Sequence, residues 1–505
     1  MTRFPGPVLA RWTGWWLIWH ELSGNREKVI DQLHRTYGPV VQISPKQISV
    51  NNHAGFHEIF AMNRRLDRPP LLLMHNYGSE NMFSTVDGNL HQQRRQPMRN
   101  LYAVRSIESS DVQRVFKSAL EDFTQYIDTH VTQERSIDIY LLFRYLGCDI
   151  MSSIIYGPKH SLRLLHHERN RQVFEKDLIW IDKRFMCLAT LIIFLFPRLS
   201  VILRRIGLMQ KSFDESLPGN SKLKWTAREA MQDCHLKQTS PEGHQLESHV
   251  EKLSAHYQRF GKSQAIPDEN YILSDSLDHF TAALEVYNEG GLTRTSGFST
   301  TADALSAILF HLSQPANFSR QERLRTELRE HAISNDSNIT VEQTKKVGFL
   351  ECIIKETLRT NPPMPVSLER TVPLNHSIEI HEGTIHGGTQ VGAQAFSIHR
   401  NETAFPDPEV WRPERWDIPH SSAAYTLMRR HFFAFGAGPR MCIGMNIAMT
   451  QLRRTLALVY SRYQTSLGPE WFDKSGKLID FEEMRKVVLL SDKSNQMVQF
   501  EKAQP

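Results

Sequence analysis

The sequence has few cysteines, no long apolar run and little charge of one sign. Its five cysteines stand far apart among 505 residues and form no CxxC pair, which excludes a disulfide framework and a zinc ribbon. No stretch of eighteen apolar residues occurs, so no transmembrane helix is expected. The net charge of +5 is too small for a dedicated nucleic-acid binder, and we expect no nucleic-acid partner.

The composition is that of a folded chain with a large core. Hydrophobic residues make up 40% and charged residues 23%, which excludes disordered, collagenous and coiled-coil proteins. Two stretches alternate as strands do, residues 40–50 and 378–395, and predict a small sheet assembled from distant segments. Helical periodicity dominates elsewhere, in residues 107–131, 137–155, 299–312, 320–331, 341–358 and 445–463. We therefore expect a mainly α fold with a small β-rich lobe.

Two apolar features leave alternatives open. Four tryptophans near the N-terminus recur at helical spacing and predict one indole face: Trp12, Trp15, Trp16 and Trp19. That face fits either a helix packed on the core or a helix lying on a membrane surface. The apolar segments 185–196 and 201–209 fit either a buried helix or a surface that dips into lipid.

The sharpest local signal is the segment Phe435–Gly444, directly before a predicted helix. Its glycines, Gly438 and Gly444 among them, allow a tight loop that lies close to a flat cofactor. Cys442 stands just ahead of the helix N-terminus, whose free N–H groups favour a thiolate. A thiolate at this place is a ready metal ligand.

The pattern Phe435-x-x-Gly438-x-Arg440-x-Cys442-x-Gly444 resembles the haem-binding loop of the cytochrome P-450 superfamily of haem-thiolate monooxygenases. The resemblance implies the cytochrome P-450 fold and haem b, with Cys442 as the axial thiolate ligand of its iron. It also implies insertion of one oxygen atom from O2 into a lipophilic small molecule. The surrounding sequence is similar to filamentous-fungal members, whose usual setting is the tailoring of terpenoid, polyketide or alkaloid secondary metabolites.

A second segment supports the resemblance. Glu356 and Arg359 stand three residues apart on one predicted helix face and can form a charge-assisted pair. Arg415 follows in Pro413-Glu414-Arg415-Trp416. In the family such residues form a buried structural triad that holds the haem loop, and they are not catalytic.

A third segment, Ser296–Thr301, corresponds to the family's oxygen-activating helix. Thr300 matches the oxygen-handling threonine, but Ser299 stands where the family has an acid. We expect Thr300 and Ser299 to be catalytic. Three alternatives are open for the proton supply: a water-linked relay through both hydroxyls, substitution of the acid by Asp303, or unusual chemistry such as a rearrangement or a peroxide shunt.

The cofactor carboxylates need cationic partners. Arg95 and His91, in His91-Gln92-Gln93-Arg94-Arg95, match the family's propionate-binding segment, and Arg370 and Arg440 match two further propionate positions. Bidentate arginine is physically suited to a carboxylate. We also expect Val366 and Ser367 to line the substrate pocket, with Phe298 beside the oxygen groove.

The resemblance implies partners, because the chain has no flavin or nicotinamide motif. We expect an NADPH-dependent cytochrome P-450 reductase, with cytochrome b5 as a further donor, and a monomer. A basic docking face is expected from Arg94, Arg99, Arg429, Arg430, Arg453 and Arg454. Residues 1–24 are expected to be a membrane-proximal segment lacking its anchor and 25–505 a single monooxygenase domain, peripheral on the cytosolic face of the endoplasmic reticulum.

Two rival functions remain. Ser299 in place of the acid motivates a haem-thiolate isomerase or dehydratase that needs no reductase. The other rival is a non-catalytic haem-binding or ligand-binding homologue that has lost proton delivery. Incorporation of labelled oxygen into product separates the first rival from a monooxygenase.

Overall fold

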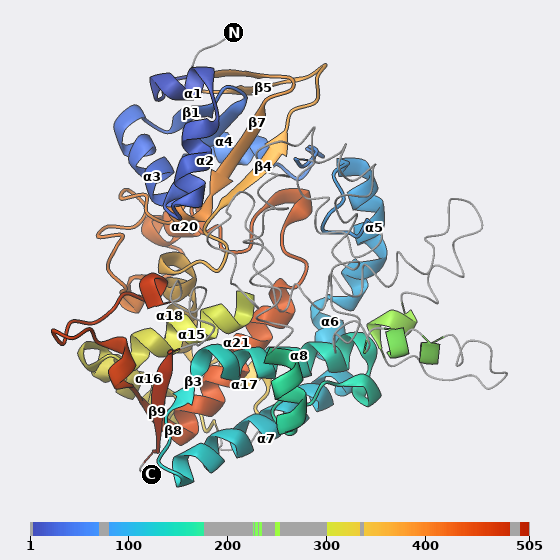
Figure 1. Cartoon of the computed structure of the whole chain (residues 1–505), viewed down its shortest axis with the longest axis vertical. Helices are drawn as coiled ribbons and strands as arrows, with labels where there is room; N and C mark the ends of the chain where they lie inside the picture. The colour runs from blue at the N-terminus through green and yellow to red at the C-terminus, as the bar shows by residue number, and fades with distance from the viewer. Residues whose placement is uncertain are drawn as a thin grey trace.

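A computed structural model describes residues 4–69, 80–175, 226, 228–230, 232–234, 248–252, 300–333, 338–484 and 495–503. Figure 1 shows an N-terminal lobe that contains a sheet, and a body of helices beneath it. The termini lie at opposite ends of the molecule in this view. This arrangement confirms the predicted mainly α fold with a small β-rich lobe.

The sheet of the lobe joins strands that are far apart in the chain. Its order is β1 (Val40–Ser44), β2 (Gln47–Val50), β7 (Gln390–Gln394) and β4 (Ser367–Thr371). Strand β2 runs parallel to β7 with Gln47 opposite Gln390, and β4 is antiparallel to β7. The prediction of a sheet from distant segments is confirmed. Two smaller sheets pair β5 (Ser377–Ile380) with β6 (Gly383–His386), and β9 (Met497–Lys502) with β3 (Ile137–Asp138) and β8 (Tyr463–Leu467).

Most predicted helices are present within a few residues of their expected ends. The helical elements of the body and its connections are α5 (Gly88–Leu101), α6 (Val104–Ile107), α7 (Ser110–Thr132), α8 (Ile139–Tyr156), α15 (Thr300–Leu312), α16 (Phe318–Glu330), α17 (Val341–Lys345), α18 (Gly348–Thr360), α19 (Ala395–Ile398), α20 (Ala423–Arg430) and α21 (Met445–Arg462). The prediction of a single helix over 341–358 is wrong, because this segment forms two helices, α17 and α18. Val347 between them is extended, and Gly348, a weak helix former, begins the second helix.

The main hydrophobic core surrounds α8 and α15, which pack against each other. Within the described ranges, α8 is the one helix with the length and apolar composition of a membrane span. However, 89% of it is buried inside the molecule, as in a core helix. The cost of burying its charged Arg144 is offset by an ion pair with Asp303 of α15, at 2.7 Å.

The prediction of one continuous tryptophan-bearing helix is wrong. The segment forms two helices, α1 (Val8–Trp12) and α2 (Trp15–Leu22), because Thr13 between them has extended backbone angles. Trp12, Trp15 and Trp19 are 82%, 53% and 68% exposed, whereas Trp16 packs against a small buried cluster. Three indoles therefore lie at the surface and one points inward. The apolar segments 185–196 and 201–209 lie outside the described residues, and the division into residues 1–24 and 25–505 stays a prediction.

Candidate functional site

A tight loop presents Cys442 at the start of α21. The N–H of Cys442 donates to the carbonyl of Phe435 at 2.9 Å, and the N–H of Gly436 donates to the carbonyl of Phe433 at 3.0 Å. Gly438 has a φ of +71°, and a Cβ there would lie 2.3 Å from the carbonyl oxygen of Phe60. Only glycine fits this close approach of the loop to α4 (His53–Ile59).

The thiol of Cys442 faces a cavity. The side chain is exposed to this cavity, but the nearby protein atoms keep water from the sulfur, and this desolvation raises its pKa; the N–H groups of Gly444 and Met445 and the Arg95 guanidinium oppose the rise. A metal cation at the thiol would replace its proton. No cluster of three or more His, Cys, Asp or Glu side chains suited to a metal occurs among the described residues. A metal at Cys442 would thus have to bring its other ligands with it.

The cavity has apolar walls and a cationic end. Its apolar walls come from several separate segments: Met82, Phe83, Tyr102, Met151, Leu358, Pro363, Met364, Leu368, Phe433, Phe435, Ile443 and Ile447. Val366 and Ser367 are buried but are not among the lining residues, so their expected place in the wall is wrong. The chain bends at Val366, and Met364 and Leu368 line the cavity instead of Val366 and Ser367.

The cationic end gathers side chains from α5, the cysteine loop and two other segments around His91. The charges of Arg68, Arg95, Arg370 and Arg440 all act on His91, which is 5% exposed. Burial, and then these four charges, lower the pKa of His91 to about 2. Its Nδ1 has no hydrogen-bond partner within the described part of the chain. His91 is neutral and four cations act on it, so this part of the cavity lacks negative charge.

The four arginines have different surroundings. Arg440 donates to the carbonyls of Thr85 at 2.7 Å and Val86 at 2.8 Å, and so also anchors the turn before α5. Arg370 is buried against the ring of Phe60 and does not line the cavity. Arg68 lines the cavity although no local motif marked it. Burial lowers the pKa of Arg95, and the sulfur of Cys442 opposes this shift.

These features together test whether haem b fits. A flat apolar ring with two carboxylates needs apolar walls, cations at one edge and an axial donor for its metal. The cavity supplies apolar walls, the arginine cluster around His91, and the Cys442 sulfur. The residues present therefore fit the group, with Arg68 as an additional cation that the sequence did not reveal.

Helix α15 forms another wall of the cavity. Thr300, Thr301 and Ala304 line it. Phe298 and Ser299 lie outside the described residues. Asp303, one turn after Thr300, does not line the cavity. Its carboxylate is bound to Arg144 at 2.7 Å inside the core, so the alternative in which Asp303 replaces the missing acid is wrong. The helical rotation turns position 303 toward α8 instead.

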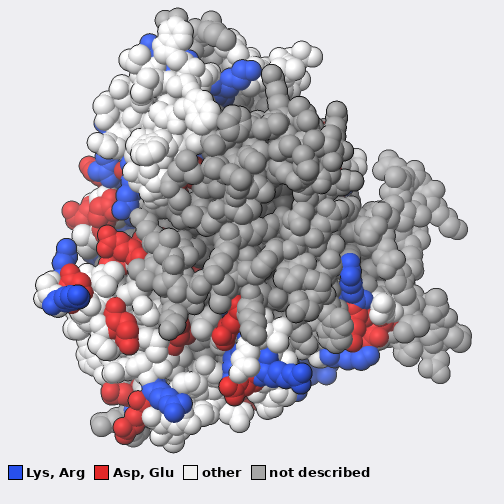
Figure 2. Space-filling view, in the orientation of Figure 1, with Lys and Arg blue, Asp and Glu red and all other residues white. Residues whose placement is uncertain are grey.

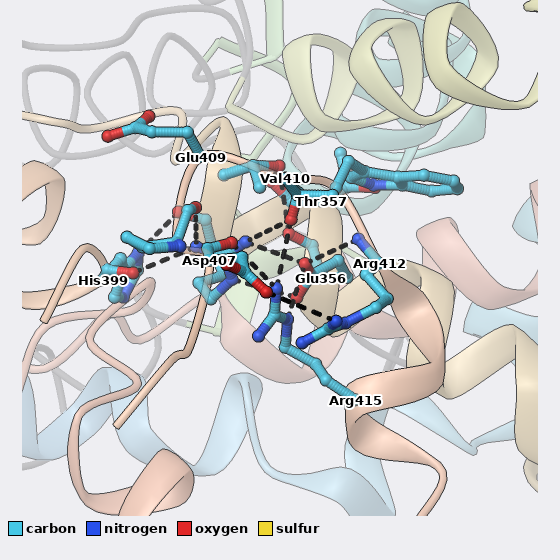
Figure 3. Close-up of polar contacts among 12 residues, drawn as sticks. Glu356, Thr357, His399, Asp407, Glu409, Val410, Arg412 and Arg415 are labelled. Atoms are coloured by element: carbon cyan, nitrogen blue, oxygen red, sulfur yellow. Dashed lines mark hydrogen bonds and ion pairs between the residues drawn. The ribbon is translucent and has the colours of Figure 1, made fainter. Parts of the chain in front are cut away.

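Ion pairs bring Glu356, Arg359 and Arg415 together, and Figure 3 shows Glu356 and Arg415 within this network. The Glu356 carboxylate accepts from Arg359 at 2.8 and 2.9 Å and from Arg415 at 2.9 Å. Glu356 and Arg359 are fully buried. Burial raises the pKa of Glu356, but the two arginines outweigh it, and its pKa is held below the usual value.

The expected basic docking face is only partly present. Arg454 is 2% exposed, bonds to Gln113 and has its pKa lowered to about 10 by burial, so its assignment to the surface is wrong. Arg94 is half-buried and paired with Glu80, and Arg453 is paired with Glu351. Arg99, Arg429 and Arg430 are exposed.

Comparison with known proteins agrees with this geometry. The sequence profile described as Cytochrome P450 matches residues 5–236 and 284–494. The chain belongs to the cytochrome P450 family. This P450 is 27% identical to the cytochrome P450 monooxygenase phqM of Penicillium fellutanum, over 94% of this chain and 85% of that one. It is 24% identical to pisatin demethylase of Fusarium vanettenii, over 92% and 85%, and 26% identical to N-acetyltryptophan 6-hydroxylase ivoC of Emericella nidulans, over 92% and 86%.

The resemblance seen in the sequence is thereby confirmed, and the protein is a P450 monooxygenase related to distant fungal P450 proteins. Membership of the family implies a haem-thiolate cofactor and, in general, a reductase partner. The roles of the individual site residues of this P450 remain assignments from its own geometry.

Proposed function

We propose that Cys442 ligates the iron of haem b and that this P450 inserts one oxygen atom from O2 into a lipophilic small molecule. The observation that carries the proposal is the Cys442 sulfur facing an apolar cavity that arginines also line. When bound, haem with a thiolate ligand supplies the oxidant for unactivated C–H bonds. The setting would be a tailoring step of fungal secondary metabolism, by analogy with the relatives.

The residues of the chain would divide the remaining tasks. Arg95, Arg68 and Arg440 would bind the two haem carboxylates, with His91 as a second donor once the carboxylates are present. Arg370 would support them from behind the wall. Phe435, Gly438 and Gly444 would shape the loop, and the triad would hold its surroundings rigid. Thr300 would hold and pass protons at its hydroxyl, together with Ser299.

The electron donor would dock behind the cysteine loop. A surface hollow there shares Leu358, Phe435, Gly436 and Met441 with the wall of the cofactor cavity, so only the loop separates the two. The hollow is lined by Met441, Met445 and Met449, and by Lys345, Lys355 and Arg453, which are ion-paired with Glu108 and Glu351 of the same lining. Three cations against two carboxylates leave a small positive excess that suits an acidic reductase surface, and flexible methionines adapt to a partner.

Contact with a membrane would occur through the N-terminal lobe. Trp12, Trp15 and Trp19 are exposed together with Val8 and Leu9, which are 70% and 62% exposed. Figure 2 shows few charged side chains over α1 and α2, whereas charged side chains gather over the lower part of the molecule. Tryptophan prefers the membrane interface. Peripheral attachment to the cytosolic face of the endoplasmic reticulum would follow.

The membrane contact is tested by flotation with vesicles of neutral and anionic phospholipid. A variant with Trp12, Trp15 and Trp19 changed to serine should lose most of its vesicle binding. The matched control changes Met62 and Leu374, which are 75% and 84% exposed elsewhere, to serine, and should bind as the wild type does. Equal binding by both variants would exclude the indole patch as the contact.

The proposed chemistry is tested by the absorption spectrum of the reduced protein with carbon monoxide, and by turnover in labelled O2. Thiolate ligation shifts the main haem band far to the red of a histidine-ligated complex, and we expect that band. Label in the product establishes oxygen insertion. Product without label would favour an isomerase or dehydratase. This alternative is suggested by α15, whose described part has no acidic side chain facing the cavity.

A further inference from the structure

His399 links two parts of the support around the cysteine loop. It is fully buried, and its Nε2 lies 2.7 Å from the N–H of Phe433, which donates to it. Its Nδ1 lies 3.1 Å from the carbonyl oxygen of Arg359. Because Nε2 must accept, the ring proton sits on Nδ1 and is donated to Arg359. The ring also stacks on Phe432.

The triad by itself does not reach the cysteine loop. The hydrogen bonds of the Glu356, Arg359 and Arg415 side chains go to each other and to the segment 399–416, and none within the described residues goes to 433–444. Figure 3 shows His399 at the edge of this network. From His399 the chain of bonds continues to Phe433, whose carbonyl accepts from Gly436 inside the loop.

We propose that His399 is a positioning residue that couples the triad to the loop carrying Cys442. One side of its ring is fixed by the backbone carbonyl of Arg359. The Arg359 side chain is in turn held by two hydrogen bonds to Glu356. The other side fixes the N–H of Phe433 at the start of the loop. The sulfur is thereby held in one place before any cofactor binds. This inference rests on the proposed role of Cys442 as the haem ligand.

The state of the ring supports this role. Burial, and then the charge of Arg359, lower the pKa of His399 to about 3, so the ring stays neutral and Nε2 stays an acceptor at physiological pH. Loss of that acceptor leaves the N–H of Phe433 buried without a partner, which is costly. The loop would relax to find one and carry Cys442 with it.

Two substitutions separate the two halves of the coupling. In His399→Asn the amide reaches Arg359 but offers no acceptor to Phe433, whereas His399→Gln extends an acceptor to the place of Nε2. We expect the Asn variant to lose haem about tenfold faster and to lose part of the thiolate-type carbon monoxide complex. The Gln variant keeps the bond to Phe433 and loses the one to Arg359, and should fall between wild type and the Asn variant in both measurements.

The matched control is His34→Asn. His34 is also buried, bonding the Gly38 carbonyl through Nδ1 at 3.1 Å and the Ser49 hydroxyl through Nε2 at 2.8 Å, but it lies in α3 (Arg26–Tyr37), away from the cysteine loop. This variant should lower the thermal unfolding temperature without changing the carbon monoxide spectrum. Equal spectra and haem loss for the Asn variants at 399 and 34 would overturn the coupling. Absence of the thiolate band in the wild type would instead overturn the proposed function.

Discussion

At the scale of single residues, Cys442 and His91 face one cavity, and the charge of Arg95 acts on both. Burial raises the pKa of the thiol, and Arg95 only partly opposes it. Four arginines and burial keep His91 neutral. The cavity thus lacks two kinds of charge that a ligand would supply: a metal cation at the sulfur and carboxylates at the arginines.

The sulfur can be tested by itself. Cys442→Ser should fold and should give no thiolate-type carbon monoxide band, because a hydroxyl does not ionise at neutral pH to replace the thiolate. The measurement is the reduced spectrum with carbon monoxide. Cys352→Ser, a buried cysteine in α18, is the control and should keep the band. Retention of the band in Cys442→Ser would exclude Cys442 as the ligand.

The hydroxyl of Thr300 is expected to guide protons. Thr300→Ala should retain haem but divert electrons into hydrogen peroxide, because proton delivery at the cavity wall is disturbed. Peroxide formed per NADPH consumed, in the presence of reductase, measures this. Ser306→Ala on the same helix is the control, since its hydroxyl bonds to the carbonyl of Ile139 in the core. Unchanged coupling in Thr300→Ala would remove it from the relay.

At the scale of elements, α8 and α15 are joined by the Arg144–Asp303 pair. Arg144 is fully buried, with its guanidinium stacked on the ring of Tyr140 and one N–H donated to the Tyr140 carbonyl. The pair fixes the rotation of α15, and this rotation decides that Thr300 and Thr301 face the cavity.

Breaking this pair should be costly. Arg144→Leu leaves the Asp303 carboxylate buried without its cation and should lower the free energy of unfolding by about 3–5 kcal/mol. Denaturant unfolding measures it. Arg35→Leu removes the partly exposed pairs with Asp31, Glu402 and Glu409 and should cost less than about 1 kcal/mol. In the double variant Arg144→Leu with Asp303→Leu, much of the loss should be recovered; similar losses in the Arg144 and Arg35 variants would contradict the assignment.

Local motifs predicted part of this molecule well. The cysteine loop and the triad were evident because their contacts are specified by short spacings. Arg68 was missed, because it approaches His91 only where Asp67 bridges Thr371 across the lobe. The surface assignment of Arg454 was avoidable, since it lies at helical spacing with the buried Ile447, Gln451 and Leu458. The break at Thr13 between α1 and α2 also had a local signal, because Gly14, a weak helix former, follows Thr13 and caps α2.

At the scale of the whole molecule, buried histidines make stability depend on pH. Burial lowers the pKa values of His34 and His311 to about 4, in the lobe and in the body. The unfolded chain binds protons below about 6.5 that these native side chains reject, so the unfolding free energy falls as pH falls from 6.5 toward 4. Glu21 and Asp149, whose pKa values burial raises to about 7, act in the opposite sense between about 4 and 7.

One histidine can be separated from the others by substitution. At pH 5 the wild type should have lost about 2 kcal/mol of stability through His34, which His34→Asn cannot lose. The stability difference between the two proteins should therefore shrink by that amount between pH 7.5 and pH 5. Denaturant unfolding at both values measures it. A difference that is constant with pH would show that His34 titrates normally in the native protein.

The parallel pairing of β2 with β7 has a consequence during synthesis. Gln47 and its partner Gln390 are separated by 343 positions, so the ribosome needs about 17–70 s to deliver the second strand after the first. For that interval β1 and β2 can pair with each other but expose an open edge. Expression yield should thus depend on how well the cell protects the nascent hairpin until the last third of the chain emerges.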